Sequence, residues 1–235
     1  MTAVIAPRTR VPAAVAALAV SGLLLAGCGA SLGPSESERG TERFGAVSRV
    51  EVEARAGTIQ VRPGPDGSSQ VDRFLKWNGD AKPQLTQEVR GDVLHVVATC
   101  PNDNQCSAEL VLTVPAASAV RADLGAGNVA VTGLSGAQDL SSSAGNVAGT
   151  GLGAAPVVAK TPAGNVDLTF AAAPPTVDAD SSAGNVTVRL PVGPVYDVDA
   201  TSSAGNARVE VAATPGAEHR IKAHSSAGNV SVLPG

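Results

Sequence analysis

The stretch that decides the fold is VDADSSAGNVTV at residues 177–188. Apolar or small residues alternate with polar ones on both sides of its central Ala-Gly-Asn, which is typical of two β-strands that each turn one face to a core. Glycine reaches the positive backbone angles of a tight corner, and asparagine tolerates them better than most residues. The stretch therefore predicts a strand, a sharp corner and a second strand.

The same unit recurs along the chain. The steps between successive Asn residues of Ala-Gly-Asn are 18, 19, 20, 21 and 23 residues. Repetition at this period is typical of proteins whose units cannot bury an apolar face alone and therefore stack on their neighbours. The Asn residues that end the corners are Asn128, Asn146, Asn165, Asn185, Asn206 and Asn229.

Strand–corner–strand units can form antiparallel hairpins or the coils of a parallel solenoid. The constant alanine favours the solenoid, because stacked coils place identical residues about 4.8 Å apart, whereas a hairpin has no need for the same residue before every turn. We expect the six Asn side chains to form an inward or corner ladder, and the alanine to lie where nothing larger fits. The prediction is an all-β fold, a parallel β-solenoid with about 18–23 residues per coil.

The start of the chain predicts an export signal. Arg8 and Arg10 precede an apolar run over residues 11–25, which is shorter than the roughly 20 residues that span a bilayer. The run ends in LAGC at residues 25–28, which resembles the lipobox of bacterial lipoproteins. By that resemblance Cys28 becomes the first residue of the mature chain and carries acyl chains. An ordinary signal peptide that contains a cysteine is the alternative.

Three parts follow from these observations. Residues 1–27 are the predicted lipoprotein signal peptide, and residues 28–43 are the lipidated cysteine and a flexible Gly-, Ser- and Glu-rich tether. Residues 44–235 are the predicted solenoid domain, which opens with a repeat-like segment at residues 50–61. The net charge of the whole chain is −4, and this mildly acidic balance argues against a nucleic-acid partner.

Cys100 and Cys106 are the other two cysteines. In an exported protein a disulfide between them would persist, and we favour that interpretation. Metal binding is the alternative, but no Cys or His lies close enough in sequence to complete a set of four ligands. A bridge across so short a loop would pin a turn more than it would stabilise the whole fold.

Four carboxylates are the strongest candidates for chemistry. If the repeats stack in chain order, these carboxylates gather on one face of adjacent coils, where they could hold Ca²⁺ or supply an acid–base pair for sugar cleavage. The same register places Lys160 beside Asp180 and Lys222 beside Asp199, so we interpret the carboxylates as surface charge partners. Asp178 alone lacks such a partner. The four are Asp178, Asp180, Asp197 and Asp199.

The other residue patterns are weaker candidates for a functional site. His219 and His224 are five residues apart on one predicted strand, so they point to opposite faces and do not suggest a joint metal site. The serines precede corners and do not form a nucleophile motif, and the glycines lack the Gly-Lys-Ser/Thr of a phosphate loop. Trp77 is the one sugar-stacking candidate, although a lone Trp is more typical of a partly buried position. We therefore predict no catalytic residue, no metal site and no cofactor.

The order of the motifs resembles the DUF4097 family of adhesin-like β-solenoid lipoproteins of actinobacteria. The shared features are the lipobox, a short tether, the Cys-Pro-x4-Cys element, a strand that ends in Val-Pro and serial turns of the Ser-Gly-Asp/Asn-Val kind. This sequence uses Asn where the family more often has Asp. The family carries no assigned reaction, so the resemblance implies a fold and a location and not an activity.

We expect a non-enzymatic protein on the outer face of the cell membrane, held there through lipidated Cys28. Its expected role is structural, adhesive or binding, toward a polymer or protein of the cell envelope. An envelope-stress sensor that modulates a membrane signalling partner is the first alternative, and a polysaccharide-active enzyme is the second. An aromatic-lined cleft with close carboxylates would favour the enzyme, whereas a flat face with paired charges would favour the scaffold.

Overall fold

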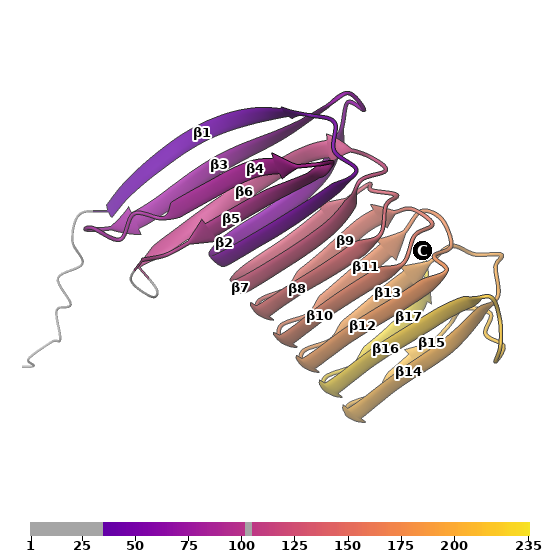
Figure 1. Cartoon of the computed structure of the whole chain (residues 1–235). Coiled ribbons are helices and arrows are strands. Elements are labelled where there is room, and N and C mark those ends of the chain that lie inside the picture. Colours follow the sequence, from indigo (N-terminus) through magenta and orange to yellow (C-terminus); the bar gives the residue numbers. More distant parts are fainter. Residues whose placement is uncertain (1–34, 102–104) are drawn as a thin grey trace, which may run out of the picture. The chain divides into compact units, whose positions relative to one another are not determined.

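Strands make up the regular structure of the part of the chain that the computed structural model describes, residues 35–101 and 105–235 (Figure 1). Cys28, the predicted signal peptide and the first part of the predicted tether lie outside these residues. Since the described residues form no helix, none of their segments meets the length and hydropathy that a membrane-spanning helix needs.

The strands form two faces that meet at the Ala-Gly-Asn corners. Face A contains the strands that precede the corners, and face B contains the strands that follow them. β2 (Arg49–Gly64) and β7 (Ala119–Thr132) run through a corner and belong to both faces. Face A further contains β4 (Gln84–Arg90), β5 (Val93–Thr99), β8 (Gln138–Ala144), β10 (Val157–Ala163), β12 (Thr176–Ala183), β14 (Tyr196–Ala204) and β16 (His219–Ala227).

Face B carries the second strand of each coil and two strands from the start of the domain. These are β1 (Ser35–Gly45), β3 (Ser68–Asn78), β6 (Cys106–Pro115), β9 (Val147–Leu152), β11 (Val166–Phe170), β13 (Val186–Leu190), β15 (Ala207–Val209) and β17 (Val230–Pro234). Neighbouring coils pair in parallel, and antiparallel pairing is confined to β1–β3, β3–β6 and β4–β5 among the described strands. The predicted all-β, mostly parallel solenoid is confirmed.

The core lies between the two faces. Along β12 and β13 every second residue is buried, with Val177 and Ala179 on the first strand and Val186 and Val188 on the second. The parallel register places like residues side by side, as with Val157 and Val177. Inward positions alternate along each strand, so a small apolar residue at every second position is enough to fill the thin interior.

The predicted flexible tether is shorter than expected, because residues 35–45 form β1. This strand pairs antiparallel with β3 along its whole length, from Ser35 beside Asn78 to Gly45 beside Ser68. The charged residues of this segment make contacts with β3. Glu38 and Glu42 each place a carboxylate oxygen 3.9 Å from a guanidinium nitrogen of Arg73. Charged residues are also typical of edge strands, which they protect from further pairing.

The order of the coils departs from the order of the chain at one place. β16 lies between β12 and β14 on face A, and β17 lies between β13 and β15 on face B (Figure 1). The last coil in the sequence therefore occupies the last-but-one place in the stack. The expectation that the repeats stack strictly in chain order is wrong at this point.

Candidate functional site

The glycine of each corner cannot be replaced by a residue with a side chain without displacing the neighbouring coil. Gly164 and Gly184 have φ values of 147° and 155°. A Cβ atom on Gly184 would lie 1.9 Å from the carbonyl oxygen of Gly164, and one on Gly164 would lie 2.1 Å from that of Gly145. The corners of adjacent coils therefore touch backbone to backbone.

The asparagines form a ladder at the solvent-exposed corner. The side-chain Oδ1 of one Asn accepts a hydrogen bond from the backbone N–H of the Asn in the next coil, at 2.8 Å between Asn165 and Asn185. Five of the six side chains are exposed and Asn165 is half-buried, so the ladder is not inward. The other bonds run from Asn146 to Asn128, Asn165 to Asn146, Asn229 to Asn185 and Asn206 to Asn229, at 2.8–3.1 Å.

A second ladder runs inside the corner and is formed by the hydroxyls that precede the turns. A Ser or Thr four residues before each of the last five Asn residues donates its hydroxyl to the carbonyl oxygen of a corner glycine in the neighbouring coil. Most of these side chains are fully buried, such as Ser181 and Thr161. The signal in the sequence is the Ser or Thr that recurs four residues before the corner Asn. The donors are Ser142, Thr161, Ser181, Ser202 and Ser225, at 2.7–2.8 Å from their acceptors.

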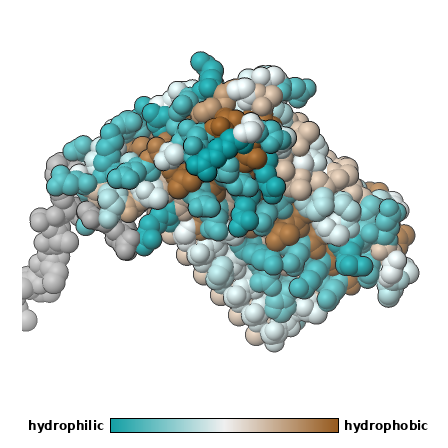
Figure 2. Space-filling model, viewed as in Figure 1, coloured by the Kyte–Doolittle hydropathy of each residue, from teal (hydrophilic) through white to brown (hydrophobic). Residues whose placement is uncertain are grey.

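The corner alanines do not have the role that the repeat suggested. All six are exposed, so the corner leaves room outside them. Pale residues of intermediate hydropathy line the edge that the corners of the later coils form (Figure 2). The tight position is the glycine and not the alanine.

On face A the charged side chains pair with one another. Asp178 on β12 contacts Lys160 on β10, with Nζ and Oδ2 3.1 Å apart, and Lys222 on β16, with Nζ and Oδ1 3.7 Å apart. The hydrogen bond and the charge of Asp178 raise the pKa of Lys160. The prediction that Asp178 lacks a basic partner is therefore wrong: it has two, and the inserted β16 supplies the second.

The four acidic candidates do not gather in one place. Asp178 and Asp180 lie on β12, whereas Asp197 and Asp199 lie on β14, and β16 separates the two strands. Lys222 is the register neighbour of both Asp178 and Asp199. Within residues 35–101 and 105–235, no group of three or more His, Cys, Asp or Glu side chains is arranged to hold a metal ion.

The histidines make local contacts. Nδ1 of His219 lies 2.9 Å from the carbonyl oxygen of Pro174, and its ring centroid lies 5.6 Å from that of buried Tyr196. Nδ1 of His224 lies 3.0 Å from the hydroxyl of Thr201 on the neighbouring strand. The two rings thus serve separate neighbours.

Trp77 is not an exposed platform for a sugar ring. Its side chain is buried on the inner side of β3, and the ammonium group of Lys82 lies 5.4 Å from the ring centroid. The ring therefore belongs to the first part of the core.

A shallow hollow on the outer side of β1, β3 and β6 was not predicted. It has a volume of about 480 Å³, and Phe74 and Val111 form its apolar part. Arg39 and Lys76 lie over the Phe74 ring, at 4.4 and 4.6 Å from its centroid. Lys76 is also 2.6 Å from the carboxylate of Glu109, so the charges around the ring are already engaged.

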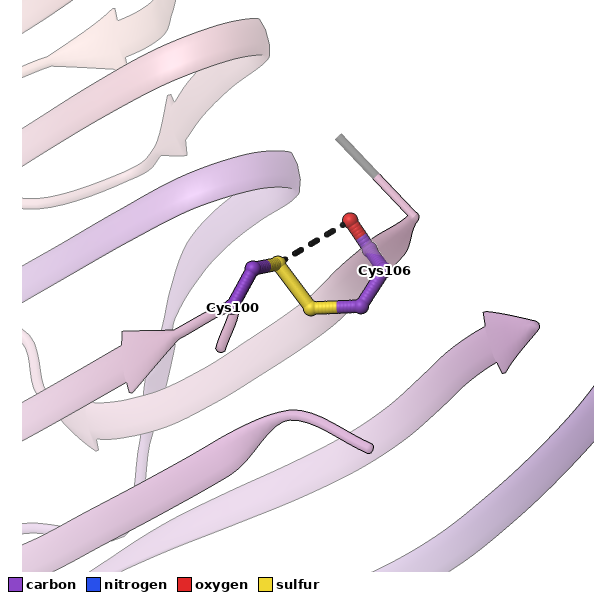
Figure 3. The surroundings of a disulfide bond; sticks show 2 residues. All are labelled: Cys100 and Cys106. Atoms are coloured by element: carbon purple, nitrogen blue, oxygen red, sulfur yellow. Dashed lines mark hydrogen bonds between the residues drawn. A yellow bond between two sulfur atoms is a disulfide. The ribbon is translucent and has the colours of Figure 1, made fainter. Parts of the chain in front are cut away.

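The predicted disulfide is present between Cys100 and Cys106, with the two Cα atoms 5.7 Å apart (Figure 3). It closes the connection from β5 to β6. Sγ of Cys100 also lies 3.2 Å from the carbonyl oxygen of Cys106. The bridge thus holds the step from face A to face B in the β5–β6 coil, which lies beside β2 and contains no Ala-Gly-Asn.

Comparison with known proteins shows a shared fold. No protein-family model matches the chain, and no curated protein matches it. A crystal structure from Clostridium sporogenes, provisionally named a cell adhesion protein, is similar with a TM-score of 0.51 and 10% identity, over 85% of this chain and all of that one. A Bacteroides fragilis protein provisionally named an adhesin reaches a TM-score of 0.36 and 14% identity, over 84% of this chain and 97% of that one. At such identity, the first likeness shows the fold alone.

Proposed function

We propose that this chain is a lipid-anchored, non-enzymatic solenoid that presents a stiff strand surface to a polymer or protein of the cell envelope, outside the cytoplasm. The observation that carries the proposal is the pairing of charges on face A, where Lys160 and Lys222 both hold Asp178. Carboxylates that are engaged by neighbouring strands support the sheet itself. They do not converge on a substrate as a catalytic pair would.

The two corner ladders support the same role. Each Ala-Gly-Asn coil is tied to its neighbour by an Asn side chain outside and by a Ser or Thr hydroxyl inside, as at Asn165–Asn185 and Ser181–Gly164. Such a stack keeps its surface residues at fixed spacing, which suits an extended partner that lies along the coils. The provisional cell-adhesion name of the Clostridium sporogenes protein and the resemblance to the DUF4097 family point to the same adhesive or structural role.

The anchor rests on Cys28 and the apolar run before it. Only residues 29–34 separate that cysteine from β1. A chain spans at most about 3.5 Å per residue, so acylated Cys28 would hold β1 within roughly 25 Å of the bilayer surface. Two or more acyl chains are needed for stable anchoring, and the lipobox resemblance implies them.

The anchor is tested by labelling cells with an alkyne-bearing fatty acid and separating membranes from the soluble fraction. The full chain should be labelled and stay with the membrane after a salt wash. Cys28→Ser should be unlabelled and either released or left with its leader uncut. A Cys100→Ser/Cys106→Ser chain, which keeps Cys28, is the matched control and should remain labelled. A Cys28→Ser chain that is processed and still membrane-bound would refute the anchor.

The binding role is tested with the detergent-extracted full chain on isolated cell envelopes. Cross-linking and identification should recover an envelope polymer or protein, and incubation should release no new sugar ends. Release of sugar ends that Asp178→Asn/Asp199→Asn abolishes would establish the enzyme instead. Recovery of a membrane kinase or regulator as the main partner would favour the sensor.

A further inference from the structure

Two coils at the end of the solenoid compete, we infer, for the same slot beside β12 and β13, and side chains at a few aligned positions decide which of them fills it. The Tyr196 coil is β14 and β15, and the His219 coil is β16 and β17. The slot holds the His219 coil, although the Tyr196 coil precedes it in the chain. This inference is independent of the proposed function.

The corner ladders and the register of the first strand offer no preference between the two coils. The register of β16 is the same against β12 and against β14, with Ala227 beside both Ala183 and Ala204. Each coil carries the corner glycine, the corner Asn and the inner serine, and Ser202 and Ser225 each donate to a corner glycine carbonyl of the adjacent coil. Either coil could therefore make the same ladder bonds to β12 and β13.

The interior of the slot favours the His219 coil. Ile221 and Val230 are fully buried there. The aligned residues of the Tyr196 coil are smaller, namely Val198 and Ala207, and in the end position Val198 is only half-buried and Ala207 is exposed. With the coils exchanged, smaller side chains would occupy the enclosed position and larger ones the open end. The observed order thus removes more apolar surface from water.

The charges on face A favour the same order. Lys222 lies between Asp178 and Asp199, so each neighbouring pair has opposite charges. If the coils stacked in chain order, Asp178 would be the direct neighbour of Asp199, and like charges side by side on a sheet destabilise it. Asp197 and Arg220 would be neighbours in either order of the coils. The neighbour of Asp178 is therefore the charge contact that differs between the two orders.

The connections allow the insertion. The segment between β15 and β16, residues 210–218, is longer than the segment between β13 and β14, residues 191–195. It passes the outer edge of β14, where the N–H of Tyr196 donates to the carbonyl oxygen of Ala212. After β17, the N–H of Gly235 donates to the carbonyl oxygen of Leu190. The longer segment lets the chain return from β15 to the place between β12 and β14.

The test exchanges the deciding residues between the two coils and keeps the composition of the full chain. The substitutions are Val198→Ile, Asp199→Lys, Ala207→Val, Ile221→Val, Lys222→Asp and Val230→Ala. Coil order is measured by disulfide formation between exposed corner positions, since neighbouring strands bring Cα atoms within bonding range. Ala183→Cys/Ala227→Cys reports the observed order, and Ala183→Cys/Ala204→Cys reports chain order. Ala163→Cys/Ala183→Cys, neighbours in both, is the control for folding.

In the natural background, the 183–227 link should form at least tenfold faster than the 183–204 link, and in the exchanged background the preference should reverse. A preference for 183–227 that persists in an exchanged chain with an intact control link would overturn the inference. If the control link is lost, the charge pair Asp199→Lys/Lys222→Asp is measured alone. That pair should lower the preference for 183–227 at least threefold, and an unchanged ratio would overturn the inference too.

Discussion

At the scale of single residues, the structure constrains the three residues of the Ala-Gly-Asn corner to different degrees. Glycine is required by its backbone angle and by the carbonyl oxygen of the neighbouring coil, which lies where a Cβ atom would be. Asparagine contributes one hydrogen bond at an exposed position, and alanine meets solvent. A buried polar contact at the corner comes from outside the triplet, from hydroxyls such as that of Ser181. How regularly a residue recurs in the sequence therefore does not indicate how strongly the structure constrains that position.

Gly184→Ala is expected to lower the free energy of unfolding by about 2 kcal/mol or more, because it combines a strained backbone angle with a Cβ 1.9 Å from the Gly164 carbonyl oxygen. Urea unfolding followed by circular dichroism measures the loss. Gly45→Ala is the matched control: a Cβ there meets no atom within 4 Å, so the change should stay within about 0.5 kcal/mol. Equal effects of the two substitutions would contradict the corner contact.

Asn185→Ala should cost about 1 kcal/mol, because Asn185 Oδ1 accepts the N–H of Asn229 at 2.8 Å. Asn185→Asp should stay within about 0.5 kcal/mol of the natural chain, since a carboxylate oxygen accepts the same bond and the corner is exposed. Thermal and urea unfolding of both variants distinguish these outcomes. An Asp variant less stable than the Ala variant would indicate that the corner is dry, contrary to the structure.

At the scale of elements, β1 shows how a polar segment becomes a strand. It contributes few apolar side chains, and polar contacts with β3 hold it in place. The hydroxyl of Thr41 donates to Asp72 at 2.6 Å, and Arg43 donates to Gln70 at 3.1 Å. The hydrogen bond from Thr41, followed by that from Gln70, lowers the pKa of Asp72. The ionised carboxylate of Asp72 therefore adds to the backbone pairing that docks β1 on β3.

Thr41→Val should lower the free energy of unfolding by about 1 kcal/mol at pH 7, by removing the donor to Asp72. A carboxylate whose pKa is lower in the folded than in the unfolded state stabilises the fold at pH values above its unfolded pKa, which is near 4. This stabilisation is lost as the pH falls through the folded pKa. The difference between the natural chain and Thr41→Val should thus shrink below about pH 4, as measured by urea unfolding across pH. Thr86→Val on β4 is the control and should show no such trend. A pH-independent difference at position 41 would exclude the Asp72 contact as its cause.

At the scale of the whole solenoid domain, the two ends of the coil stack are built differently. At the first end, polar contacts join the two faces: Lys82 reaches Glu38 at 2.7 Å, and Gln87 reaches Glu42 at 2.9 Å. At the other end, buried Tyr196 fixes the Tyr196 coil, and its hydroxyl donates to the carbonyl oxygen of Pro191. β15 in that coil is exposed throughout. Terminal coils of repeat proteins commonly deviate from the consensus, because they face solvent on one side.

Removal of residues 215–235 tests how independent the two ends are. The shortened chain should lose strand signal in circular dichroism, while the emission of Trp77, the only tryptophan, and its unfolding midpoint should change little. The reason is that coils contact only their nearest neighbours, and Trp77 lies at the first end. A loss of the Trp77 signal together with the strand signal would show that the domain unfolds as one cooperative unit.

The sequence by itself determined the properties that a short stretch of chain can specify. The alternation around VDADSSAGNVTV predicted strands with one buried face, and the recurring Ala-Gly-Asn predicted stacked coils with identical residues side by side. Both predictions depend on local geometry and on the repeat period, which are visible in one dimension. The disulfide between Cys100 and Cys106 was predicted from the expected export of the chain, and the structure contains it.

Only the tertiary structure decided which copy of the repeat lies beside which. Equivalent repeats fit any neighbour equally well through their backbones, so the choice depends on small differences between side chains that meet only in the folded stack. The structure inserts the last coil before its predecessor and thereby gives Asp178 its second lysine. It also places residues 35–45 on β3, because the partner that turns a charged segment into a strand lies far away in sequence. A periodic sequence specifies the coil, whereas contacts between coils specify their order.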